Sequence, residues 1–154
     1  MIEEITKKDQ AWLLDFGNGL QAAVAYHEMW QVLLSPKLFD VACTPQYCSH
    51  VLIFQKRILP VLNLATFLLD AHKPFIATGN VVGIAVYQTD PQAPVNYDCL
   101  YLSQMPQRIE VSDEDACDLP DEIKYWEPLT LSCFLRNEVA IPIIDFASLF
   151  SREN

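Results

Sequence analysis

The chain has 154 residues, which is enough for one domain or two small lobes with a sizeable core, and 51% of them are hydrophobic. Its net charge of −10 repels phosphate backbones and anionic membrane surfaces, so we expect no nucleic-acid partner. No apolar run approaches the roughly 18 to 20 residues of a membrane span, and the start MIEEITKKDQ lacks the apolar core of a signal peptide, so the sequence predicts a cytoplasmic protein without membrane insertion.

The N-terminal third predicts short strands and a long loop. Residues 1–10 are polar and are expected to form an arm. The apolar stretches 12–16 and 20–26 flank Gly17-Asn18-Gly19, which is a strong hairpin signal. Residues 27–34 are expected to stay extended or to form one irregular turn, and a loop containing Pro36 and Pro45 follows.

A compact unit comes next, with the sequence VLIFQKRILPVLNLATFLL from Val51 to Leu69. Two apolar, β-branched runs of strand length are separated by the polar residues Gln55, Lys56 and Arg57, which predicts a hairpin. Asn63 then offers a side-chain oxygen to the free amides of a following helix of about two turns.

The middle of the chain alternates strands with polar connections. A second hairpin is expected from 75–78 and 81–87 around Gly79 and Asn80, and VVGIAVY at 81–87 is apolar enough to lie between two packed surfaces. Further strands are expected at 97–105 and 107–111. The segment SDEDACDLPDE at 112–122 has six acidic residues in eleven positions and is interpreted as a solvated loop.

The unit at Val51–Leu69 occurs twice. Eighty-two positions further on, CFLRNEVAIPIIDFASLFS runs from Cys133 to Ser151 and aligns Pro60 with Pro142 and Asn63 with Asp145. The shared proline and the shared helix cap favour internal duplication over two unrelated hairpins. Since proline cannot donate to a strand ladder, each proline is expected at a strand start, an edge or a bulge.

These patterns give eight to ten short strands with small helical connectors and no long helical periodicity. Strands of this length and spacing are typical of barrels or sandwiches. The duplication then favours two similar small barrels.

The sequence offers little for catalysis. Cys43, Cys48 and His50 could supply three zinc ligands, but a structural site needs a fourth and usually more closely spaced pairs. No local pattern activates Cys99 or Cys117 as a nucleophile, and four glycines in the whole chain cannot form a phosphate-binding loop. The five cysteines are odd in number and are expected to be free thiols. We expect no catalytic residue, no cofactor and no metal, and rank a thiol or metal enzyme below a binding module.

The residues Thr44 to Leu68 resemble the CheW-like domain of bacterial chemotaxis coupling proteins and CheA-type histidine kinases. The signature of that family is a proline-bearing loop, a glycine, an apolar strand, an Arg-Gly turn and a strand of the form ILPV-x-[DN]-L before a short helix. The chain departs from it with His50 in place of the glycine and Gln55-Lys56 in place of Arg-Gly.

The resemblance implies a mainly β fold of two intertwined five-stranded SH3-like barrels with short helical connectors. It covers residues 10–152 as a single domain of two interlaced lobes, approximately 11–72 and 73–152. It also implies a non-catalytic adaptor that binds the regulatory domain of a CheA-type histidine kinase and, as a second partner, the cytoplasmic tip of a chemoreceptor. The changed turn favours a divergent member, with a type IV pilus (twitching motility) pathway as one candidate output.

Two hypotheses for the partner remain open. One is the chemosensory kinase, and the alternative is that the barrel fold has been recruited to a non-chemotactic protein. In either case the predicted protein-binding residues are the hairpin turn Gln55, Lys56 and Arg57 together with Tyr47, which is expected to lie adjacent to the turn, because an exposed turn offers donors and a tyrosine offers an aromatic anchor. The core or framework residues are expected to include Pro60, Val61, Leu64, Pro142 and Ile143.

Overall fold

The structure is a computed structural model that describes residues 8–17, 19–69 and 81–151, and the chain is mainly β. Its helical elements are short: α1 (Leu64–Leu69) and α2 (Phe146–Ser151), with 3-10 turns η1 (Tyr26–Glu28), η2 (Gln46–Cys48), η3 (Asp113–Asp115) and η4 (Asp121–Leu129). The strands of the described residues are β1 (Lys8–Gly17), β2 (Leu20–Ala25), β3 (Met29–Leu34), β4 (Phe39–Asp40), β5 (His50–Phe54), β6 (Arg57–Leu62), β7 (Val81–Tyr87), β8 (Asn96–Leu102), β9 (Gln107–Ser112), β10 (Thr130–Arg136) and β11 (Val139–Ile144).

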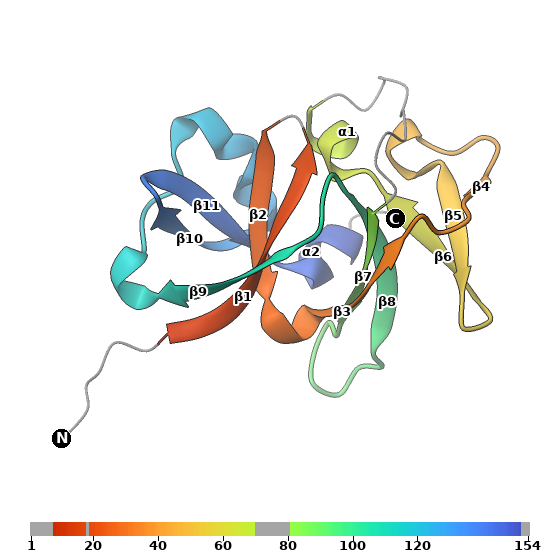
Figure 1. The fold of residues 1–154 in the computed structure, drawn as a ribbon, viewed down its shortest axis with the longest axis horizontal. Coiled ribbons are helices and arrows are strands. Elements are labelled where there is room, and N and C mark those ends of the chain that lie inside the picture. Colours follow the sequence, from red (N-terminus) through yellow and green to blue (C-terminus); the bar gives the residue numbers. More distant parts are fainter. Residues whose placement is uncertain (1–7, 18, 70–80, 152–154) are drawn as a thin grey trace.

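The strands form two sheets that lie side by side, as Figure 1 shows. One has five strands in the order β10-β11-β2-β1-β9, and the other has six in the order β3-β7-β8-β6-β5-β4. The sixth strand, β4, contains only two residues at the sheet edge. This is the expected mainly β architecture of two small SH3-like units.

The two units are intertwined through β3 and β9. The turn η1 carries the chain from β2 in the first sheet into β3, which pairs with β7 of the second sheet. In the opposite direction, β9 follows β8 along the chain but pairs with β1. Neither sheet is therefore built from residues 11–72 or 73–152 alone.

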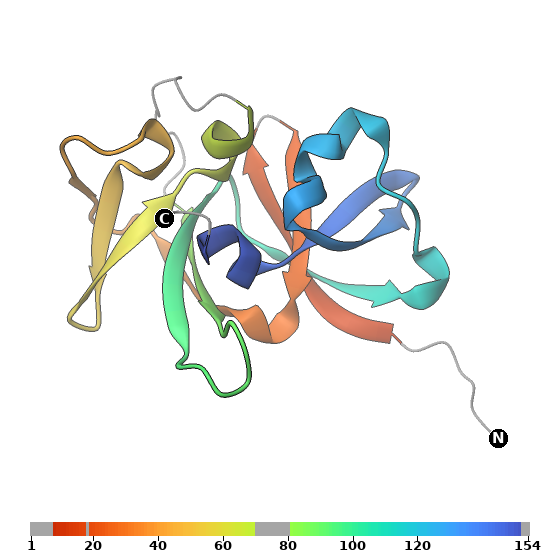
Figure 2. The ribbon, with the colours of Figure 1, turned by 180° about the vertical axis from the view of Figure 1, so that it is seen from behind.

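Three hydrophobic clusters stabilise this arrangement. Each sheet has its own small core, and a larger cluster joins the two sheets through both α-helices. Figure 2 shows α2 lying between the sheets. Phe146 and Leu149 of α2 are buried in this joining cluster with Leu64 of α1, and Trp126 of η4 is buried there as well. Burying each such side chain stabilises the folded state by about 1.5–3 kcal/mol, so this cluster holds the two lobes together as a shared hydrophobic core.

The predicted repeat is present in the backbone. In the β5–β6 hairpin Val51 pairs with Pro60, and in the β10–β11 hairpin Cys133 pairs with Pro142. Both second strands then run parallel to a strand outside their own hairpin: β6 pairs with β8, and β11 pairs with β2. The two halves thus use the same register and the same topology.

Both helices are also capped in the same way. The amide of Thr66 donates to the side chain of Asn63 at 3.1 Å, and the amide of Ala147 donates to Asp145 at 3.2 Å. Asp145 additionally accepts a bond from the hydroxyl of Ser148 at 2.8 Å. A capping side chain at this position satisfies an amide that the helix itself cannot pair, which fixes where each helix begins.

Some local expectations need correction. Pro60 and Pro142 lie inside interior strands rather than at strand starts, but parallel pairing begins only at Val61 and Ile143, so the missing donor costs no ladder bond. Strand β1 begins at Lys8, so the end of the expected polar arm belongs to a sheet.

Two further predictions are confirmed, and others concern residues that the structure does not describe. The hairpin around Gly17 and the strand at 81–87 are confirmed. The strand expected at 75–78, its turn at Gly79 and Asn80, and residues 1–7 of the arm lie outside the described residues. Within the described ranges, no helix has the length and apolar character needed to cross a bilayer.

Candidate interaction surface

The predicted turn is exposed at the tip of the β5–β6 hairpin. Gln55 and Lys56 both have left-handed backbone, with φ of 51° and 67°. This is the conformation of a two-residue hairpin turn that matches the twist of its strands. Arg57 is exposed, and its guanidinium lies 4.9 Å from the centre of the Tyr97 ring. Its planar cation is therefore held against an aromatic face.

An aromatic cluster lies beside this tip. The Trp30 ring packs edge-on against Phe54 at 5.5 Å and at a tilt against Tyr97 at 4.7 Å. The three rings come from three strands, Trp30 from β3, Phe54 from β5 and Tyr97 from β8. Trp30 is 44% exposed. The second lobe therefore presents tryptophan, tyrosine and arginine together, the types most enriched at the energetic centres of interfaces.

Tyr47 is not part of that group. It lies in η2, before β5, so the five-residue strand separates it from the turn by roughly 17 Å. Its ring packs edge-on against Phe67 at 4.9 Å, and its carbonyl accepts the amide of Asn63 at 2.7 Å. The structure gives Tyr47 a packing role beside α1, and the expected adjacency of Tyr47 to the turn is wrong.

The sequence interpretation missed an apolar sheet face next to the turn. Ile53 and Ile58 are directly opposed in the β5–β6 hairpin and are 60% and 70% exposed. The next outward pair is Val51 with Pro60, and Phe39 of β4 pairs with Val51 on the same side. We call these five side chains the β4–β6 face. A contiguous exposed apolar face of this kind marks an interaction site in soluble proteins.

Cationic side chains lie at the margins of the β4–β6 face. Lys37 places its amine 5.2 Å from the centre of the Phe39 ring. Lys56 lies at the other margin, in the turn, whereas Arg57 lies on the opposite side of the hairpin, where its guanidinium packs against the Tyr97 ring. In a chain of net charge −10, this is a locally basic rim, and it favours a partner with acidic groups around an apolar centre.

The second copy of the hairpin has a different surface. Its outward pair, Cys133 and Pro142, is buried, whereas Val51 and Pro60 are partly exposed. Leu135, which corresponds to Ile53, is 47% exposed, and the half-buried Ala140 replaces Ile58. The apolar face is therefore wider and more accessible on the N-terminal copy.

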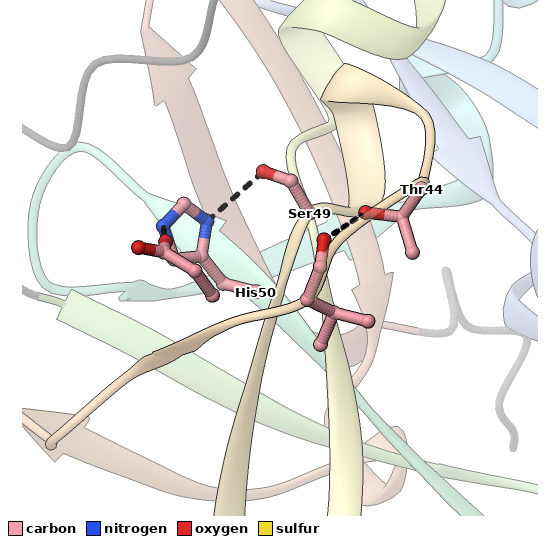
Figure 3. A network of polar contacts seen from close by, with 5 residues as sticks. Thr44, Ser49 and His50 are labelled. Atoms are coloured by element: carbon pink, nitrogen blue, oxygen red, sulfur yellow. Dashed lines mark hydrogen bonds and ion pairs between the residues drawn. The ribbon is translucent and has the colours of Figure 1, made fainter.

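A polar network lies at the edge of the second sheet (Figure 3). The His50 ring contacts Asp40 at 2.7 Å through Nε2 and the Ser49 hydroxyl at 3.1 Å through Nδ1, and the Thr44 hydroxyl donates to the carbonyl of Val41 at 2.8 Å. The order Asp-His-Ser resembles a hydrolase triad, but the Asp40 side chain is 89% exposed and cannot orient a histidine as a buried carboxylate does. We interpret the network as an anchor for the loop before β5.

The described residues provide no cage for a metal ion. Within ranges 8–17, 19–69 and 81–151, no three histidine, cysteine or acidic side chains come close enough to hold one. His50 instead uses its ring nitrogens for Asp40 and Ser49. Burial raises the pKa of Cys99 and of Cys133 to about 12, so both thiols are protonated at neutral pH and neither is activated as a catalytic nucleophile.

Two carboxyl groups meet at the joint between the lobes. Burial and the nearby charge of Asp145 raise the pKa of Glu28 to about 7. Glu28 comes from η1, which carries the chain between the sheets, and Asp145 caps α2. The joint therefore contains a carboxyl group that changes its charge near neutral pH.

The first sheet and the turns that follow its strands line a cavity. Its volume is about 440 Å³, and its lining mixes apolar groups such as Val24, Phe134 and Ile143 with polar groups such as Asp9 and His27. None of the four predicted binding residues lines it. The cavity and the β4–β6 face therefore lie on different lobes.

Comparison with known proteins identifies the fold. No family model matches the chain, and no curated protein matches its sequence. A solved structure matches the fold instead. The scaffolding protein TtCheW from Thermoanaerobacter tengcongensis superposes on the chain with a TM-score of 0.68 over 90% of each chain, at 12% sequence identity. The chain has a CheW-like fold.

The CheW-like fold accommodates both departures from the family signature. His50 occupies an ordinary strand position in β5, where no glycine is required. At the turn the left-handed backbone expected of an Arg-Gly pair is retained, but the non-glycine residues Gln55 and Lys56 adopt it. The C-terminal copy repeats the same angles at Asn137 and Glu138.

A sequence signal for the β4–β6 face does exist. A half-exposed strand alternates apolar and polar residues, yet positions 51 to 54 are apolar on both sides of the strand, as are 58 to 62. That pattern is typical of a strand that is buried on both faces. In the structure of this chain, however, no described element packs over the outer face of β5 and β6, so the apolar residues there are exposed.

Proposed function

We propose that this protein is a non-catalytic adaptor of a bacterial chemosensory signal-transduction system, acting in the cytoplasm. Its principal partner is the regulatory domain of a CheA-type histidine kinase, which docks on the β4–β6 face. The supporting observation is the exposed pair Ile53 and Ile58 on a CheW-like fold.

The chemistry of the face suits this partner. An apolar centre with a polar rim is the usual layout of a protein interface, and its energy is concentrated in a few central residues. Ile53 and Ile58 provide the centre, and Gln55 and Lys56 of the turn provide the rim, with Arg57 next to the turn on the other side of the hairpin. Tyr47 lies at the other end of β5 and has no part in this contact.

The finer parts of the proposal rest on the resemblance described above. They are a second contact with the cytoplasmic tip of a chemoreceptor and an output such as type IV pilus motility. The alternative function is a protein-interaction module with a non-chemotactic partner. The exposed face is compatible with either, so the experiment must identify the partner as well as the surface.

The test is binding of the purified chain to the regulatory domain of the CheA-type kinase from the same organism, measured by co-migration and by calorimetry. We expect Ile53→Asp to weaken binding by about 30-fold or more, because it places a charge in an apolar contact worth about 2 kcal/mol. Leu135→Asp is the matched control, since it makes the same change at the corresponding position of the other copy. It is expected to alter binding less than about twofold.

Arg57→Glu tests whether the contact extends around the hairpin tip to the side of Tyr97. It should weaken binding less than Ile53→Asp does, with the thermal midpoint nearly unchanged, because Arg57 is exposed. No binding by the unmodified chain would remove the kinase as partner. Binding that is lost in Leu135→Asp but kept in Ile53→Asp would move the contact to the other lobe.

A further inference from the structure

Two cysteines outside the proposed binding face lie directly opposite each other. The antiparallel bridge between Ala116 and Phe134 sets the register, so the next pair inward is Cys117 with Cys133. The amide of Cys117 donates to the carbonyl of Cys133 at 2.9 Å. Their sulfur atoms are 3.4 Å apart, with the Cys117 thiol directed at the sulfur of Cys133.

This geometry suits a disulfide. Directly opposed residues in an antiparallel pair have Cα atoms about 4.5–5.5 Å apart, which is inside the range of about 4.4–6.8 Å found across disulfides. The sulfur atoms need to approach by about 1.4 Å to reach the bond length of about 2.05 Å. Rotation about the side-chain torsions can supply this, because Cys117 precedes a loop and is only half-buried.

We propose that Cys117 and Cys133 are a thiol pair that closes to a reversible disulfide when a small disulfide such as glutathione disulfide is present. The Cys117 thiolate attacks one sulfur of the reagent, breaking its S–S bond and releasing one thiolate. The Cys133 thiolate then attacks the sulfur of Cys117 and displaces the second. Two protein thiols are oxidised, one reagent disulfide is reduced to two thiols, and no other reactant is needed.

The burial of the two groups sets the order of the steps. Cys117 is half-buried and can meet a reagent from solution, whereas Cys133 is buried. Burial also raises the pKa of Cys133 to about 12, so its thiolate is scarce at neutral pH. The link should therefore form faster as the pH rises.

Closing this bond would fasten one end of η4 to β10. The bond joins residues 16 positions apart and encloses η4, whose Trp126 and Leu129 belong to the core that joins the lobes. A cross-link of this kind restricts the unfolded chain more than the folded one. We therefore expect oxidation to raise the thermal midpoint, and this consequence is independent of the partner proposed above.

The experiment uses the full chain, incubated with glutathione disulfide at pH 7 and at pH 9 and then alkylated and digested without reduction. Mass spectrometry should find a peptide pair linked through Cys117 and Cys133, formed faster at pH 9, and the oxidised protein should melt at a higher temperature until a thiol reductant is added. Cys117→Ser should abolish the link and the shift. Cys43→Ser is the matched control, because Cys43 is exposed and remote in sequence, and it should change neither.

Two outcomes would overturn the inference. The first is a stable adduct of glutathione on Cys117 with no link to Cys133, which would show that the pair only packs. The second is a midpoint shift that persists in Cys117→Ser. Because the principal measurement is made on the unmodified chain, a variant that folds poorly does not leave the question open.

Discussion

The two copies of the hairpin and helix, residues 50–69 and 132–151, share a backbone but not a surface. Strand register, turn angles and helix caps agree between them. At matched positions, Val51 and Pro60 are partly exposed, whereas their counterparts Cys133 and Pro142 are buried. The exposed Ile58 likewise corresponds to the half-buried Ala140. The comparison teaches that local rules preserved the framework while these positions diverged.

The largest difference expected between the copies concerns their helices. Leu64 and Phe146 are the corresponding first residues of α1 and α2, and both are fully buried. We expect Leu64→Ala to cost about 2–5 kcal/mol and Phe146→Ala about 3–5 kcal/mol of unfolding free energy, because each leaves a cavity in the core between the lobes. Urea unfolding measures both changes.

Phe146→Ala should be the more damaging change, since the Phe146 ring also packs against Phe150 at 5.7 Å. Leu69→Ala, at the exposed end of α1, is the control and should change stability by less than about 0.5 kcal/mol. A small loss for Phe146→Ala would show that α2 is not the joint that its burial indicates.

A second difference is electrostatic. The C-terminal cap is the charged Asp145, and it contributes to raising the pKa of Glu28 to about 7 from its ordinary value of 4.5, whereas the N-terminal cap is the neutral Asn63. A carboxyl group whose pKa is higher in the folded state destabilises folding as pH rises from about 4.5 to about 7. Glu28→Gln removes this cost.

Glu28→Gln should therefore stabilise the protein by about 1–2 kcal/mol at pH 8, after allowance for solvent screening, and have almost no effect at pH 4. The denaturation midpoint at the two pH values measures this. Glu110→Gln, at an exposed position of β9, is the control and should show no such pH dependence. Equal effects of Glu28→Gln at both pH values would rule out an ionisation effect.

The smallest expected effect tests what the copies share. Lys56 and Glu138 both have φ of 67°, where a side chain costs energy and glycine does not. We expect Lys56→Gly and Glu138→Gly each to stabilise the fold by about 0.5–1 kcal/mol. Similar gains would confirm that the turns are equivalent, and a loss in only one would show that its side chain makes a contact specific to that copy.

Much of the fold was predictable because its signals are local. The strand at 81–87, the turn at Gln55 and Lys56, and the caps at Asn63 and Asp145 each follow from a few neighbouring residues. The face proposed for binding was harder to predict. A turn can be recognised in a sequence, but the exposure of Ile53 and Ile58 depends on what packs above them, and strand patterns do not contain that information.

The sequence by itself determined that a strand-turn-strand-helix unit occurs twice, because turns, caps and alternation act over a few residues. Only the tertiary structure decided that β1 and β2 share a sheet with β9, β10 and β11, that Tyr47 lies away from the turn, and that Cys117 faces Cys133. These features depend on pairing between residues far apart in the chain. The free energy of such pairing comes from shared burial, which no single segment contains.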